Sequence, residues 1–383
     1  MTKQPPPTTT IGSFPKPKYL PVRDWFDAAR EDGGMNSSTI TKDYTKTSQT
    51  LNEADEALFQ QAAKEIINIQ LDAGITIPTD GEVRRENYIH YHCRHLTGFD
   101  FNHLEHRVLR DGAYETDLPA IRGLVKRERP AYAVKDYLAA QKLSPVPLKF
   151  TLPGPLTIMD TNADCFYYDR KKLNHDLAET VNKEILSLVE AGCKYIQVDE
   201  PLFARQVDDA VRFGFEGLEH CFHRVPKGVT RIVHMCCGYP DHLDDEDYKK
   251  ADPDSYSKLA NYVDEAGFDQ LSIEDAHCCN DLSLLDKLSK GQYASYHTFI
   301  DILDEEHTVA IRDPAAKHEF KPKSQIQSGE KSSVMANEVT HNPQEFLLES
   351  RYRCDIIDSR TFDEGEKYDK DNIKDGKTRQ KRE

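Results

Sequence analysis

The chain has 383 residues and a formal net charge of −16, so it can bury one large core, and its acidic balance argues against nucleic acid or an anionic membrane surface as a partner. No apolar run is long enough to cross a bilayer, and the N-terminus lacks the apolar core of a secretory signal. The nine cysteines have no framework spacing, which is typical of a reducing compartment, so we expect a cytoplasmic enzyme that acts on small molecules.

The first predicted strand, 8–15 (TTTIGSFP), runs into a Gly-Ser turn. Ser13 and the backbone amides of that turn form a candidate carboxylate site, although an ordinary turn serine has the same local sequence. Apolar residues at helical spacing predict a helix over 53–73, closed by Gly74. The second strand, 76–82 (TIPTDGE), ends in two acids beside a glycine, which are either site residues or solvated loop acids.

The segment 83–148 is longer than an ordinary connection between barrel strands. We interpret it as an excursion, with a hairpin as one form, beside the mouth of a barrel. It is rich in aromatic residues and histidines. A second metal site at His90, His92, Cys93 and His95 is possible, but no metal-binding spacing supports it, and surface or packing roles are favoured.

Three further strands and two helices follow in alternation; the first of these strands ends in a Pro-Gly-Pro turn and the other two end in acids. The strands are 148–155, 195–201 and 270–275, with helices at 171–191 and 255–266. The strand 195–201 (YIQVDEP) ends in Asp199 and Glu200, and 270–275 (QLSIED) also ends in acids.

Between these elements, RIVHMCCGYP at 231–240 predicts a buried strand that Gly238 and Pro240 end. Residues i and i+2 of a strand point the same way, so His234 and Cys236 share one side. An imidazole and a thiol so placed are suited to zinc. The alternative is a core histidine beside an inert buried cysteine.

Strands alternating with helices, without a Gly-rich nucleotide loop, predict an α/β chain with a (β/α)8 TIM-type barrel over 1–312. The polar clusters lie at carboxyl ends of strands, where such barrels place their chemistry. The last strands are poorly defined: 282–288 is helical and 307–312 is a weak strand. The remainder, 313–383, is charge-laden and is predicted to be a poorly ordered tail.

The order of several short motifs resembles the catalytic barrel of the cobalamin-independent methionine synthase family. The motifs are IGSFP at 11–15, DGE at 80–82, LPGPLTI at 152–158, VDEP at 198–201, HMC at 234–236 and SIE at 272–274. They cover about three quarters of the chain. The chain is most similar to the short, single-barrel members of the family.

The resemblance implies a zinc-dependent transfer of a methyl group from a 5-methyltetrahydrofolate-type donor to homocysteine. It implies that His234, Cys236 and Glu274 are zinc ligands. It further implies that Ser13 holds the carboxylate of the amino acid, and that Glu82 and Asp199 receive its ammonium group.

The chain departs from the family pattern at three places. The family's last zinc ligand, a cysteine in an Asp-Cys-Gly stretch, is absent; Cys354, Cys278 and Cys279 are alternatives. The catalytic histidine has no secure counterpart, although His297 and His307 lie nearby in sequence. MDTNAD stands where larger members stack the pterin on a tryptophan. Alkyl transfer to another small thiol, or a non-catalytic relative with an incomplete barrel, are therefore alternative functions.

Overall fold

The computed structural model describes residues 7–23, 38–109, 114–237, 251–274, 284, 287, 293–297 and 309–311. The predicted tail, 313–383, lies outside the described residues, as do Cys278, Cys279, His307 and Cys354. Within the described part, no helix is both long and apolar enough to cross a membrane.

The core of the structure is a six-stranded sheet in the order β3-β5-β6-β7-β8-β9. The strands are β3 (Lys149–Pro153), β5 (Tyr195–Asp199), β6 (Thr230–Met235), β7 (Gln270–Glu274), β8 (Tyr293–His297) and β9 (Val309–Ile311). The first five are parallel, and β9 is antiparallel to β8. The predicted α/β class with a parallel sheet is therefore confirmed, whereas barrel closure is not shown by the described strands.

The two predicted N-terminal strands are wrong in extent, because they form only two isolated parallel bridges, Thr9 with Ile77 and Ser13 with Gly81. Here a side chain accepts a backbone hydrogen bond that a neighbouring strand would otherwise accept. The Thr79 N–H donates to the side-chain oxygen of Gln70 at 2.9 Å. The segment still adjoins the sheet, since the Lys149 N–H donates to the Pro78 carbonyl at 2.9 Å.

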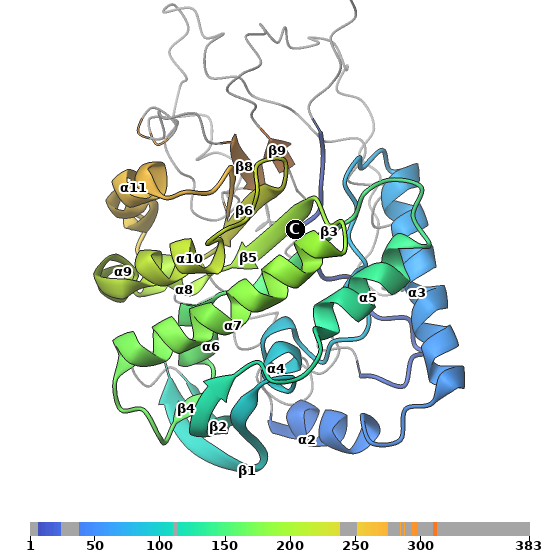
Figure 1. Cartoon of the computed structure of the whole chain (residues 1–383), viewed down its shortest axis with the longest axis horizontal. Coiled ribbons are helices and arrows are strands. Elements are labelled where there is room, and N and C mark those ends of the chain that lie inside the picture. Colours follow the sequence, from blue (N-terminus) through green and yellow to red (C-terminus); the bar gives the residue numbers. More distant parts are fainter. Residues whose placement is uncertain are drawn as a thin grey trace, which may run out of the picture.

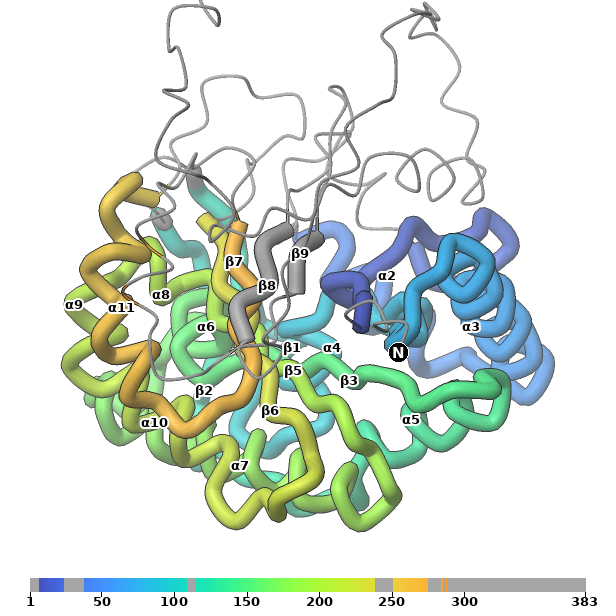
Figure 2. Tube along the Cα trace, turned by 90° about the horizontal axis from the view of Figure 1, so that it is seen from above, coloured from blue at the N-terminus to red at the C-terminus, as the bar shows by residue number. Residues whose placement is uncertain are grey.

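Helices lie along the outer side of the strands, as Figures 1 and 2 show. The outer ones are α3 (Glu53–Asp72), α5 (Tyr132–Gln141), α7 (Arg170–Glu190), α10 (Phe215–Cys221) and α11 (Ser255–Glu265). A capping box of Asn52 and Asp55 starts α3. Gly74 follows it with a φ of +87°, so the predicted helix end is confirmed.

The segment 83–148 holds a short helix, a long hairpin and α5. The hairpin is β1 (Thr97–Leu109) paired antiparallel with β2 (Tyr114–Lys126), preceded by α4 (Tyr88–Cys93). Parallel pairing joins β2 to β4 (Ala163–Asp164), which follows α6 (Pro155–Asp160). Since α6 begins just after β3 ends, this small sheet lies on the carboxyl side of β3 (Figure 1).

The remaining described helices are α2 (Ser38–Thr47), α8 (Leu202–Arg205), α9 (Val207–Asp209) and the π-helical turn η2 (Ala210–Gly214).

Alternation along the strands separates an apolar face from a polar one. The buried apolar set includes Phe150, Leu152, Ile196, Val198, Val233, Met235, Leu271 and Ile273. The buried polar set, on the other face, includes Lys149, Thr151, Gln197, Asp199, His234, Gln270, Ser272 and Glu274. Barrel interiors are usually filled by branched apolar residues, so this polar interior marks the place to look for chemistry.

Candidate functional site

Glu82 is held in a fixed place at the end of the second N-terminal segment. It follows Gly81, and both residues have positive φ, 57° for Glu82 and 70° for Gly81. This backbone is unusual for a glutamate and costs free energy, so its surroundings must hold it. Its Oε1 accepts a hydrogen bond from the Thr151 hydroxyl at 2.6 Å and lies 3.3 Å from Nη1 of Arg85.

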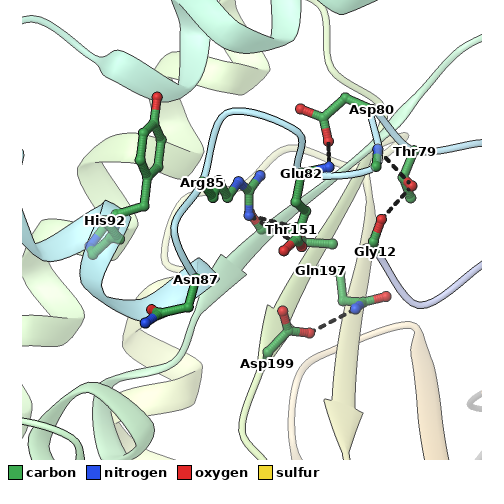
Figure 3. Close-up of polar contacts among 12 residues, drawn as sticks. Gly12, Thr79, Asp80, Glu82, Arg85, Asn87, His92, Thr151, Gln197 and Asp199 are labelled. Carbon is green, nitrogen blue, oxygen red and sulfur yellow. Dashed lines mark hydrogen bonds and ion pairs between the residues drawn. The ribbon is translucent and has the colours of Figure 1, made fainter. Parts of the chain in front are cut away.

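Gly12 lets the Ser13 turn lie against this carboxylate. A Cβ on Gly12 would be 2.6 Å from Oε1 of Glu82, which is closer than real contacts allow. The Gly12 carbonyl accepts from the Thr79 hydroxyl at 2.8 Å. Figure 3 shows Gly12, Thr79 and Glu82 gathered beside Thr151. The structure therefore brings Ser13 and Glu82, two predicted site residues, into neighbouring bridged segments.

Asp199 ends β5 and supplies the second acid. Its Oδ1 accepts from the amide nitrogen of Gln197 at 2.7 Å. Burial, and then the negative charge of Glu82, raise the pKa of Asp199. Burial likewise lowers the pKa of Lys149 on the neighbouring strand. A buried carboxylate whose charge is disfavoured by a neighbouring carboxylate forms a site that a cation such as an ammonium group would stabilise.

Glu200, the neighbour of Asp199, has a different role. Its carboxylate accepts from the N–H groups of Leu156 and Thr157 at 2.9 and 3.0 Å, at the start of α6. A Cβ on Gly154 would collide with the Glu200 side chain, so only glycine fits there. Of the paired acids, Asp199 therefore faces the polar interior and Glu200 anchors a helix.

His234 lies between Asp199 and Ser272 in the register of the sheet. Its Nδ1 is 3.1 Å from the Ser272 hydroxyl. Burial lowers the pKa of His234 to about 3, and Lys149 adds to that effect, so the imidazole is neutral near pH 7. A neutral imidazole is the form that binds metals.

Cys236 comes directly after β6, and Glu274 ends the adjacent β7. With His234 they place nitrogen, sulfur and oxygen donors, all at least nine-tenths buried, at one end of two neighbouring strands. That donor chemistry suits zinc. Their side chains are not gathered, however: Oε2 of Glu274 accepts from the Cys237 N–H at 2.9 Å. Among the described residues, no group of three such side chains is arranged to hold a metal.

His297 is the last residue of β8 and lies opposite Glu274 in the register. The parallel pairing thus brings the backbone of this candidate catalytic histidine to the same end of the sheet as the candidate zinc ligands.

The histidines in and after helix α4 contact protein groups away from the candidate zinc ligands. Nε2 of His90 lies 3.2 Å from the Thr161 carbonyl oxygen, and the His95 ring stacks on the Tyr132 ring with centroids 4.2 Å apart. These are packing contacts, as the sequence favoured.

Four polar residues beneath the site were missed by sequence reasoning: Lys149, Thr151, Gln197 and Arg85. Three of them lie on the strands at two-residue spacing, on the polar face of β3 and β5, which the alternation of LKFT and YIQVD could have indicated. Arg85 follows Glu82 by three residues and donates to the Thr151 carbonyl and hydroxyl at 3.1 and 2.9 Å.

Comparisons with known proteins show the family to which the chain belongs. Residues 6–213 match the family model described as "Cobalamin-independent synthase, Catalytic domain". A methionine synthase of Saccharolobus solfataricus is 31% identical over 270 residues, 70% of this chain and 68% of that protein. A methionine synthase of Sulfolobus acidocaldarius is 29% identical over 268 residues, which cover 70% of this chain and 67% of that protein.

Among solved structures, the chain is similar to a B12-independent methionine synthase from Shewanella sp. W3-18-1, in complex with selenomethionine. The TM-score is 0.62, the identity is 27%, and the match covers 76% of this chain and 79% of that one. The extent of the family match and the identity to these relatives confirm the resemblance carried by the sequence motifs: the chain belongs to the cobalamin-independent methionine synthase family, through its catalytic domain.

Proposed function

We propose that this chain makes methionine by moving a methyl group from a 5-methyltetrahydrofolate-type donor to the sulfur of homocysteine. The observation that carries the proposal is the pair of buried acids, Glu82 and Asp199, beside the segment that bears Ser13. The relatives named methionine synthase, and the Shewanella enzyme bound to selenomethionine, support it.

An amino-acid head group needs a negative site for its ammonium group and a donor site for its carboxylate. In the proposed pose, Glu82 and Asp199 receive the ammonium group and Ser13 donates to the carboxylate. Thr151 and Arg85 hold the Glu82 carboxylate from behind. Charge-assisted hydrogen bonds of this kind contribute about 1.5–3 kcal/mol each, which is enough to orient the substrate.

His234, Cys236 and Glu274 would hold zinc, because their donor types fit and their strands end together. Glu274 would have to exchange its hydrogen bond with the Cys237 amide for the metal. When bound, zinc would supply a Lewis acid that lowers the pKa of the substrate thiol, so that a thiolate exists at neutral pH.

The chain's own contribution is to orient the substrate and exclude water. Binding through the head group fixes the sulfur of homocysteine at the carboxyl ends of β6 and β7. In the transfer, the thiolate sulfur forms a bond to the methyl carbon while the donor's nitrogen–carbon bond breaks. The electron pair of that bond stays on the donor nitrogen, which takes up a proton equivalent to the one that the thiol has released to solvent. The thiol proton has left before this step, and the buried walls of the site limit reprotonation.

The test is methionine formation by the purified, zinc-loaded full chain with homocysteine and 5-methyltetrahydrofolate, followed by mass spectrometry. We expect Asp199→Asn to lose at least about tenfold in kcat/KM, and Asp72→Asn, on the exposed end of α3, to lose nothing. A second arm replaces homocysteine with 3-mercaptopropionate. Preferred turnover of that thiol, or no methyl transfer to any thiol, would overturn the proposal.

A further inference from the structure

Gln197 stands at the centre of a buried hydrogen-bond chain that joins two strands to the N-terminal segment. Its Nε2 donates to the Ile11 carbonyl at 2.9 Å and to Oδ1 of Asp199 at 2.7 Å. Its Oε1 accepts from Nζ of Lys149 at 2.5 Å, and Lys149 also donates to the Thr10 carbonyl. Figure 3 shows Gln197 directed toward Asp199.

The chemistry of these partners permits only one orientation of the Gln197 amide. Nζ of Lys149 donates to the Thr10 carbonyl and to the Gln197 amide, so the amide oxygen faces Lys149. A backbone carbonyl can only accept, so the amide nitrogen must face Ile11. The same nitrogen then has its second hydrogen directed at Asp199. Gln197 and Lys149 are 1% and 2% exposed, so water does not compete for these positions.

The other half of the head-group site has separate supports. Thr151 and Arg85 hold Glu82. The Ser13 segment is bridged to Gly81, and the Phe14 N–H donates to the Gly81 carbonyl at 3.0 Å. Loss of the Gln197 amide would therefore release Asp199 and remove one hydrogen bond to the Ile11 carbonyl, while Glu82 and the bridge between Ser13 and Gly81 keep their own supports.

We propose that Gln197, oriented by Lys149, is a positioning residue that aims the Asp199 carboxylate at the ammonium group of the substrate and so sets selectivity for α-amino thiols and thioethers. The inference rests on the proposed function, in that it assumes an amino acid binds here. It adds a determinant of specificity that does not itself touch the substrate.

The experiment compares two ligands by calorimetry on the full chain: L-methionine and 4-(methylthio)butanoic acid, which lacks only the amine. Gln197→Met keeps the length and the charge of the side chain but removes the amide. Gln197→Asn keeps a buried amide that is too short to reach both Lys149 and Asp199, and it preserves a test if the methionine variant does not fold. Gln61→Met, on the exposed face of α3, is the matched control.

We expect both Gln197 variants to bind L-methionine about tenfold more weakly, as loss of one hydrogen bond to a charged group does, and 4-(methylthio)butanoic acid less than about twofold more weakly. The control should match the wild type. Equal losses for the two ligands, or unchanged methionine affinity, would overturn the inference while leaving the proposed function intact. A wild-type chain that binds both ligands equally would instead overturn the amino-acid site itself.

Discussion

The Thr151 hydroxyl donates to the Glu82 carboxylate at 2.6 Å and accepts from the Arg85 guanidinium at 2.9 Å, so one side chain of β3 joins a buried acid to a buried cation. Both charges come from a segment that lies beside β3 rather than in its ladder. The position of Glu82 thus depends on a strand that lies far from it in the sequence.

Thr151→Val keeps the shape of the side chain and removes the hydroxyl. We expect a loss of about 1–3 kcal/mol in the free energy of unfolding, since a buried charged group loses a partner. We also expect L-methionine to bind at least about tenfold more weakly. Urea unfolding and calorimetry measure the two effects. Thr180→Val, at a buried threonine whose hydroxyl donates to Leu177 on α7, is the control, and its methionine affinity should not change. Wild-type methionine affinity in Thr151→Val would refute the role of this hydroxyl.

Zinc content tests the candidate metal ligands. Loss of an outer-shell partner costs about 10–100-fold in metal affinity, and loss of a ligand costs at least as much. We expect His234→Ala and Cys236→Ala to lose most bound zinc while staying folded, as measured by metal analysis and circular dichroism. His103→Ala and Cys165→Ala, at other positions of the chain, should keep it. Full zinc retention in His234→Ala and Cys236→Ala would rule out the assignment.

The pH dependence of stability tests Glu200. Burial raises its pKa from 4.5 to about 7, so the folded chain binds a proton there that the unfolded chain releases at lower pH. This contribution is fully present below about pH 4.5 and is lost as the pH rises to about 7. The stability of the wild type relative to Glu200→Gln should therefore fall across that interval.

Urea unfolding at several pH values measures the difference in the free energy of unfolding between the wild type and Glu200→Gln. Each tenfold change in the acid dissociation constant of Glu200 between the unfolded and folded chain corresponds to about 1.4 kcal/mol. Glu190→Gln, at the exposed end of α7, should show a constant difference from the wild type. A wild-type advantage over Glu200→Gln that stays level or grows between pH 4.5 and 7 would contradict the raised pKa.

The sequence by itself determined the elements whose signals are local. Periodic apolar residues with Gly74 after them predicted α3, because helix formation and capping depend on neighbours along the chain. Two-residue alternation placed His234 on the polar face of β6 for the same reason. The motif order was enough to identify the family.

Only the tertiary structure decided which polar residues meet. Gln197 and Ile11 are 186 positions apart, and Lys149 and Thr10 are 139 apart, so no local pattern marks them as partners. The same holds for Asp199 and Glu200, which are adjacent in sequence and identical in charge. Side chains alternate along β5, so Asp199 points into the polar interior. Glu200 instead accepts hydrogen bonds from three donors at the N-terminus of α6, the helix that starts at Pro155.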